Sequence, residues 1–69
     1  MNSVAIGDFI KERRNNLKIQ QQDLAELAGL SLRTIIIAES GKGNPSLTTL
    51  EKIADVLGLE VKLQVKYRP

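Results

Sequence analysis

Two short helical patterns separated by a single glycine fill residues 20–39, and they limit the fold of the chain more than any other feature. Four apolar residues of the first pattern recur at helical spacing: Leu24, Ala25, Leu27 and Ala28. Gly29 is suited to end that helix, because glycine enters a left-handed cap without steric cost. Helices of two or three turns are unstable alone in water, so the rest of the chain must brace this pair.

Further helical patterns lie on both sides of the pair. Apolar spacing and capping residues predict four helices in all, over about residues 4–16, 21–28, 32–40 and 47–57. Ser3 and Ser31 are candidate N-caps for the first and third helices, whereas Gln20 marks the start of the second only weakly. A chain of 69 residues with this pattern is expected to be mainly α-helical and to have a small core.

The predicted core lies on the inward faces of the first and last helices. The first helix contributes Ile6, Ile10 and Leu17, with Phe9 beside them. The last helix has a longer apolar stripe, formed by Leu47, Leu50, Ile53, Ala54 and Leu57. The three consecutive isoleucines 35–37 cannot all point inward on one helix, so one or two of them are expected to be exposed.

The spacing also places two opposite charges on inward faces. Arg14 lies four residues after Ile10 and three before Leu17, and Glu39 lies four residues after Ile35. A buried charge is unfavourable unless it is paired. We therefore predict an ion pair between Arg14 and Glu39 that joins the first helix to the third; the alternative is two solvated charges that never meet.

After Gly58 the apolar period changes from that of a helix to that of a strand. Five residues alternate with polar ones: Leu59, Val61, Leu63, Val65 and Tyr67. The pattern predicts one strand, over about residues 60–66, which has no partner strand elsewhere in the chain. We expect it to pair with the same strand of a second copy, which divides the chain into a helical domain over 1–58 and a dimerisation strand over 59–69. The alternatives are a strand that lies across its own helices and a tail that is ordered by another protein.

Composition excludes several classes of function. The chain has no cysteine and no histidine, so it lacks thiol and imidazole catalysts and the usual zinc ligands. We expect neither an enzyme nor a cofactor. No apolar run is long enough to span a bilayer, and the order of charges in MNSVAIGDFIKERR is wrong for a signal peptide, which predicts a cytoplasmic protein with no membrane partner. A net charge of +2 is compatible with nucleic acid.

Together these segments resemble a known family. IQQQDLAELAGLSLRTI, the glutamate that follows it and SGKGNPSLTTLEKIADVLGLEV are similar to the helix-turn-helix domain of the Cro/cI-like (XRE) regulators of bacteria and phages. The resemblance covers about residues 6–59 and implies a lambda-repressor-like fold. The C-terminal pattern resembles more narrowly the HipB-like antitoxin regulators, whose strands pair between subunits.

The resemblance also implies roles for individual residues. In the family, positions matching the following residues contact DNA: Gln21, Ser31, Leu32, Arg33, Ile36, Ile37, Lys42 and Asn44. Arg14 and Glu39 match a buried ion pair that is common in the family. Two features depart from the pattern. Gln20 replaces the usual Thr or Ser cap, and Ile36 and Ile37 are apolar where relatives present polar side chains.

The function implied is that of a sequence-specific DNA-binding repressor. A homodimer would place the third helix of each copy in the major groove of a palindromic operator, at the nucleoid. The strand pattern favours an autoregulating antitoxin with a HipA-like toxin as its partner. Alternatives are a phage Cro-like switch, a restriction-modification controller, or a protein interaction module that kept the fold without specific DNA binding.

Overall fold

The computed structural model describes residues 3–66. Within them the chain forms four helices, α1 (Ser3–Asn16), α2 (Gln21–Ala28), α3 (Leu32–Ser40) and α4 (Leu47–Leu57). The four predicted helices are therefore present, and only the start of α1 differs from its expected bound. Ser3 lies within that helix rather than at the N-cap position expected from the sequence.

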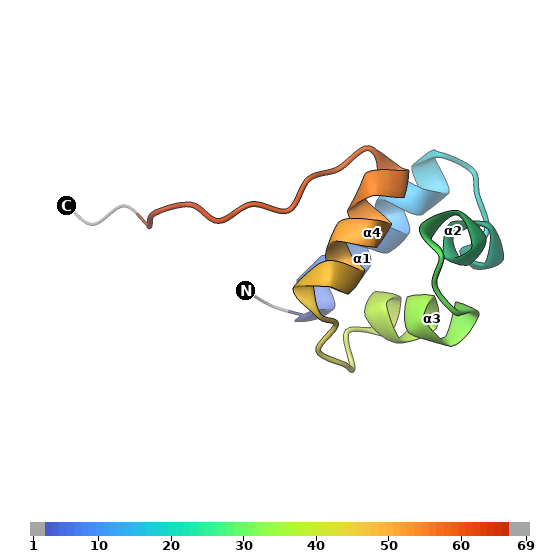
Figure 1. The fold of residues 1–69 in the computed structure, drawn as a ribbon, viewed down its shortest axis with the longest axis horizontal. Coiled ribbons are helices and arrows are strands. Elements are labelled where there is room, and N and C mark those ends of the chain that lie inside the picture. Colours follow the sequence, from blue (N-terminus) through green and yellow to red (C-terminus); the bar gives the residue numbers. More distant parts are fainter. Residues whose placement is uncertain (1–2, 67–69) are drawn as a thin grey trace.

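α1 and α4 lie alongside each other, and α2 and α3 lie against them at one end of the body (Figure 1). The largest fully buried side chains are Leu24, Ile35, Ile53 and Leu57, so α2, α3 and α4 each contribute to one core, and Ile10 of α1 packs with them. Burial of these side chains is the main stabilisation available to a domain of this size.

Three apolar residues expected on the inward faces are exposed instead. Leu17 follows the end of α1, where the backbone turns through Lys18 at a φ of 58°, so helical spacing no longer determines its direction. Leu47 opens α4 at the loop end of the helix and is 60% exposed, as is Phe9 on α1. The core is accordingly narrower than the apolar pattern suggested.

Gly7 sets the approach of α1 to α3, a role that the sequence pattern did not reveal. A Cβ at this position would lie 2.6 Å from the backbone oxygen of Glu39 and 2.7 Å from that of Ala38. No other residue type fits without moving one of the helices, because the atoms it would meet belong to backbone. The last turn of α3 is thus seated directly on the α1 backbone at Gly7.

The segment after α4 does not form the expected strand within the described part of the chain. Residues 60–66 run away from the helical body as an extended tail with no partner strand beside it (Figure 1). A strand is defined by hydrogen bonds to a neighbouring strand, and residues 3–66 offer no such neighbour. Leu59 belongs to the body, because it packs against the core and its N–H donates to the carbonyl of Ala54 at 2.8 Å. Tyr67 lies outside the described residues.

Candidate nucleic-acid interface

The turn between α2 and α3 has the geometry expected from its sequence. Gly29 adopts a φ of 68°, the left-handed conformation that ends α2, and the N–H of Leu30 donates to the Ala25 carbonyl at 2.9 Å. Ser31 then caps α3, its Oγ accepting a hydrogen bond of 3.1 Å from the backbone N–H of Thr34. These caps fix the angle at which α3 leaves the turn.

α3 is divided into a buried face and an exposed face. Its buried residues are Ile35, Ala38 and Glu39. The residues that the family resemblance assigns to DNA on this helix and its cap are all exposed: Ser31, Leu32, Arg33, Ile36 and Ile37. As expected from helical geometry, the three isoleucines separate, with Ile35 fully buried and the other two exposed. The structure therefore brings one cation, one hydroxyl and three apolar side chains to a single outward surface.

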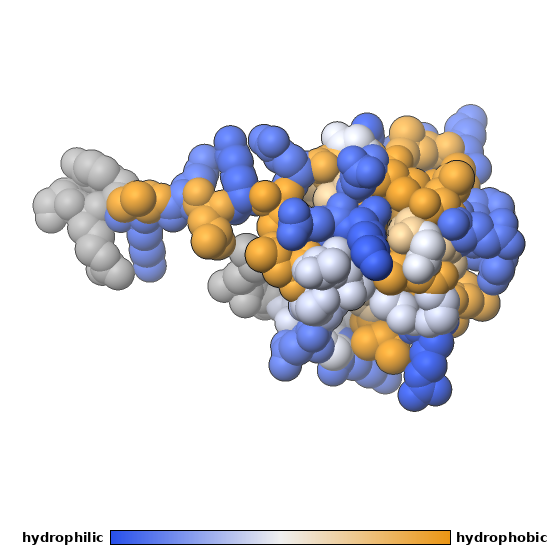
Figure 2. Space-filling model, viewed as in Figure 1, coloured by the Kyte–Doolittle hydropathy of each residue, from blue (hydrophilic) through white to orange (hydrophobic). Residues whose placement is uncertain are grey.

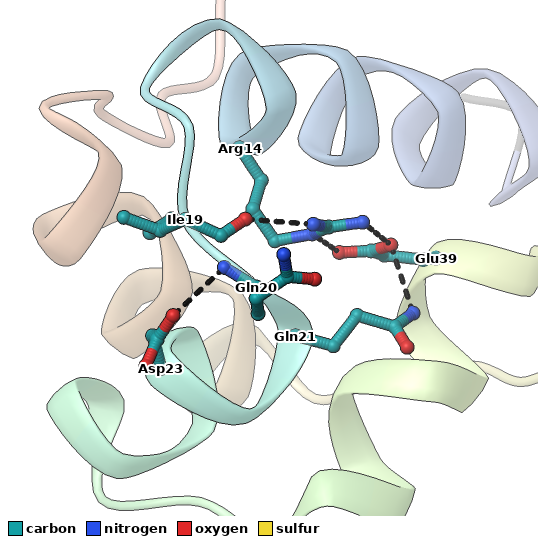
Figure 3. A network of polar contacts seen from close by, with 6 residues as sticks. All are labelled: Arg14, Ile19, Gln20, Gln21, Asp23 and Glu39. Carbon is teal, nitrogen blue, oxygen red and sulfur yellow. Dashed lines mark hydrogen bonds and ion pairs between the residues drawn. The ribbon is translucent and has the colours of Figure 1, made fainter.

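A network of buried hydrogen bonds holds this helix from behind (Figure 3). The Nε of Arg14 donates to Oε2 of Glu39 at 2.7 Å, and its Nη2 donates to Oε1 at 3.0 Å. The third donor, Nη1, reaches the carbonyl of Ile19 at 2.8 Å. This two-pronged geometry is the strongest arrangement available to an arginine and a carboxylate. The helical spacing predicted the pairing of Arg14 with Glu39. It did not predict the contact with the Ile19 carbonyl, because Ile19 lies in a connector that has no periodic pattern.

Gln21 contributes to the same network. Its side-chain Nε2 donates to Oε1 of Glu39 at 3.1 Å, so the glutamine that opens α2 is tied to the far end of α3. Gln21 is half-buried, which leaves part of its side chain accessible to solvent. A residue that contacts both the inner side of α3 and solvent is well placed to orient that helix.

The start of α2 is capped by a residue that sequence analysis missed. The backbone N–H of Gln20 donates to Oδ2 of Asp23 at 2.9 Å, which satisfies an amide just before the helix (Figure 3). Asp23 occupies the third helical position, where a carboxylate can reach back to the cap residue. A carboxylate at the third helical position was the sequence signal for this cap. The hydrogen bond to Asp23 compensates for the weak cap expected of Gln20.

The loop after α3 is anchored to the end of that helix. The hydroxyl of Ser40 donates to the carbonyl of Ile37 at 2.8 Å and accepts from the N–H of Lys42 at 3.2 Å. Lys42 and Asn44 are both exposed on this loop. The loop thus presents one cation and one amide next to α3.

Two further apolar surfaces lie outside α3. A groove of about 670 Å³ lies between α1, α4 and the start of the tail, lined mainly by Ile6, Phe9, Ile10, Leu50, Ile53 and Val61. Beyond it, apolar residues recur along the tail between hydrophilic ones (Figure 2), and Leu63 and Val65 are almost fully exposed.

Over residues 3–66 no group of acidic side chains could hold a metal ion. None of the helices in that range is long and apolar enough to cross a membrane.

Comparison with known proteins identifies a family model that matches the chain and several similar sequences. A family model described as helix-turn-helix matches residues 10–63. An uncharacterised HTH-type transcriptional regulator of Methanothermobacter thermautotrophicus is 43% identical over 52 residues, which cover 75% of each chain. The immunity repressor of Bacillus phage phi105 is 41% identical over 58 residues, which cover 84% of this chain and 40% of the longer phage protein.

A solved structure is also similar. The crystal structure of the restriction-modification controller protein C.AhdI from Aeromonas hydrophila superimposes with a TM-score of 0.79 at 33% sequence identity. The superposition covers 83% of this chain and 86% of the controller.

Proposed function

The chain belongs to the helix-turn-helix family, and from this premise we propose that it is a sequence-specific DNA-binding transcriptional repressor. The observation that carries the proposal is the exposed face of α3, which presents Arg33 outward while Glu39 holds the opposite face to α1. An exposed helix braced in this way fits the major groove, whose width admits one α-helix.

The proposed DNA contacts are of two kinds, one to a base and the others to phosphates. Arg33 reads a guanine, because a guanidinium can donate to the O6 and N7 atoms together. Ser31 and Gln21 lie at helix N-termini, where hydroxyl, amide and backbone N–H groups bind phosphate. Lys42 and Asn44 contact phosphates from the loop, and the cation makes affinity depend on salt.

The protein acts as a homodimer in this proposal. Val61, Leu63 and Val65 are exposed along a tail that has no partner strand among residues 3–66, and Tyr67 continues their alternation in the sequence. Pairing two tails as strands satisfies their backbone groups and covers these side chains, which makes residues 59–69 the dimerisation segment and 1–58 the DNA-binding domain. Two copies of α3 then meet a palindromic operator about one helical turn apart.

The similarities to known proteins favour two kinds of regulator over the antitoxin subtype. The antitoxin subtype with a HipA-like toxin rests on the alternating tail alone. The relatives include a phage immunity repressor and a restriction-modification controller, so we place a phage-type switch or a controller ahead of an antitoxin. Purification of the protein from its own cells discriminates these, because an antitoxin carries its toxin as a stoichiometric partner.

The proposal is tested by titrating the protein into labelled DNA from upstream of its own gene, beside a shuffled duplex of equal length, at two salt concentrations. Preference for the native duplex, with affinity falling steeply as salt rises, is the expected result. Equal, weak binding to both duplexes would overturn it. The exposed isoleucines of α3 would then favour the interaction-module alternative, since an apolar helix face also suits a protein partner.

A further inference from the structure

The two exposed isoleucines of α3 have different surroundings. Ile36 is 46% exposed and Ile37 is 38% exposed, values too close to distinguish them by themselves. The loop distinguishes them: a Cβ placed on Gly43 would lie 2.6 Å from Cγ2 of Ile37. The side chain of Ile37 is therefore seated against the loop backbone at Gly43, where an added Cβ would displace it.

This contact gives Ile37 a structural task. Gly43 lies between Lys42 and Asn44, the two exposed loop residues beside α3. The same stretch is fixed by Ser40, which bonds both the Ile37 carbonyl and the Lys42 N–H. Ile37 thus supports the loop from which Lys42 and Asn44 project.

Ile36 lies on a different part of the surface. It follows Arg33 by three residues and Leu32 by four, and residues at these spacings share one face of a helix. All three are exposed. An apolar pair beside a guanidinium forms a surface with one strong hydrogen-bonding group and otherwise only dispersion and hydrophobic contact to offer.

In the major groove, one group is recognised by contact of that kind, the C5-methyl of thymine. We propose that Ile36 is a specificity-determining residue that selects thymine through this methyl group, beside the base read by Arg33, whereas Ile37 positions the phosphate-binding loop. The inference rests on the proposed function and assigns a base to its recognition helix. Removing one buried methyl is expected to weaken binding on the order of fourfold, the equivalent of a single buried methylene.

The experiment uses a duplex that the full-length protein itself recovers from a randomised pool. Each thymine is replaced singly by deoxyuridine, which removes the methyl group and leaves every hydrogen-bonding atom in place. For the wild-type protein, we expect deoxyuridine to lower affinity about fourfold at one thymine of each half-site. Ile36→Ala should abolish this difference between thymine and deoxyuridine. Ile36→Val, which keeps a branched apolar side chain, should retain it.

Ile37→Ala is the matched control. It should lower affinity for every duplex tested and keep the difference between thymine and deoxyuridine. Circular dichroism and thermal unfolding establish that each variant is folded. The assignment is overturned if no deoxyuridine weakens binding, if the difference survives in Ile36→Ala, or if Ile37→Ala removes it instead. A pool that yields no preferred duplex overturns the proposed function itself, which separates the two failures.

Discussion

The guanidinium of Arg14 lies 2.7 Å from the carboxylate of Glu39, a residue 25 positions later in the chain. The contact joins α1 to the end of α3, and the side chains of both residues are less than 10% exposed. Gln21 donates to the same carboxylate, so three helices meet at one buried acceptor pair. The orientation of the candidate recognition helix is therefore determined by polar contacts as well as by the apolar core.

Removal of one partner should strongly destabilise the domain. Arg14→Met keeps most of the aliphatic stem but leaves the Glu39 carboxylate buried without its cation, and we expect the free energy of unfolding to fall by roughly 3–5 kcal/mol. Chemical denaturation monitored by circular dichroism measures the loss.

The control for this substitution is Lys62→Met. Lys62 pairs with Glu60 at 3.8 Å on the exposed tail, and its removal should change the stability by less than about 0.5 kcal/mol. The double variant Arg14→Met, Glu39→Met should be more stable than Arg14→Met alone, because no buried charge remains. A double variant less stable than the single one would contradict this account.

Gly7→Ala should destabilise the domain by roughly 1–3 kcal/mol, because the added methyl group meets the backbone of α3 and forces two packed helices apart. Thermal unfolding provides the measurement. Asp8→Ala, at the exposed neighbouring position of the same helix, is the matched control and should leave stability nearly unchanged. Equal unfolding curves for Gly7→Ala and wild type would mean that α1 and α3 are less closely seated than described.

Two cations beside α3 should affect DNA binding differently. Arg33→Ala should reduce affinity by roughly 1–3 kcal/mol for the preferred duplex and relax selection at one base pair, since a bidentate base contact is lost. Lys42→Ala should weaken binding to all duplexes and lower the slope of affinity against salt by about 1.

Fluorescence anisotropy on matched duplexes separates these two effects. Lys52→Ala, which removes one charge from an exposed position of α4, controls for net charge. If Arg33→Ala bound the preferred duplex as tightly as wild type, the assignment of the outward face of α3 would be wrong.

Assembly should depend on one face of the tail. Leu63→Lys places a charge among the apolar residues that the proposed strand pairing covers, and we expect it to shift the protein from dimer to monomer. Gln64→Lys adds the same charge to the adjacent, polar position and should leave the dimer intact. Sedimentation velocity distinguishes the two results. Dimers of equal stability in both variants would place the interface elsewhere, and the groove beside Phe9 would be the next surface to test.

The helices could be predicted from the sequence because their boundaries depend on local chemistry. Gly29 and Ser31 mark a stop and a start within three residues, and the observed α2, α3 and α4 have the expected bounds. The helix-turn-helix family expected from these segments is confirmed. The HipB-like subtype stays a prediction.

Other features depend on contacts that are distant in sequence or lie between chains. Gly7 looks like any helical glycine until the α3 backbone is known to lie on it. Leu17 does not follow the helical spacing, because the next residue, Lys18, has a left-handed backbone although it is not a glycine. A strand at 60–66 needs a partner strand, and the described part of the chain contains none, so the alternating pattern predicted a tendency to pair rather than a structure.

The residues that attach α3 to the body differ from those that we propose to read DNA. Ile35, Ala38 and Glu39 face inward, whereas Leu32, Arg33 and Ile36 face outward. Substitution of the outward residues leaves the core and the buried ion pair untouched, so under the proposed function new target sites can arise in duplicated genes without loss of the fold. The domain is for the same reason a suitable starting point for engineered regulators, in which the outward positions of a single helix are randomised and selected.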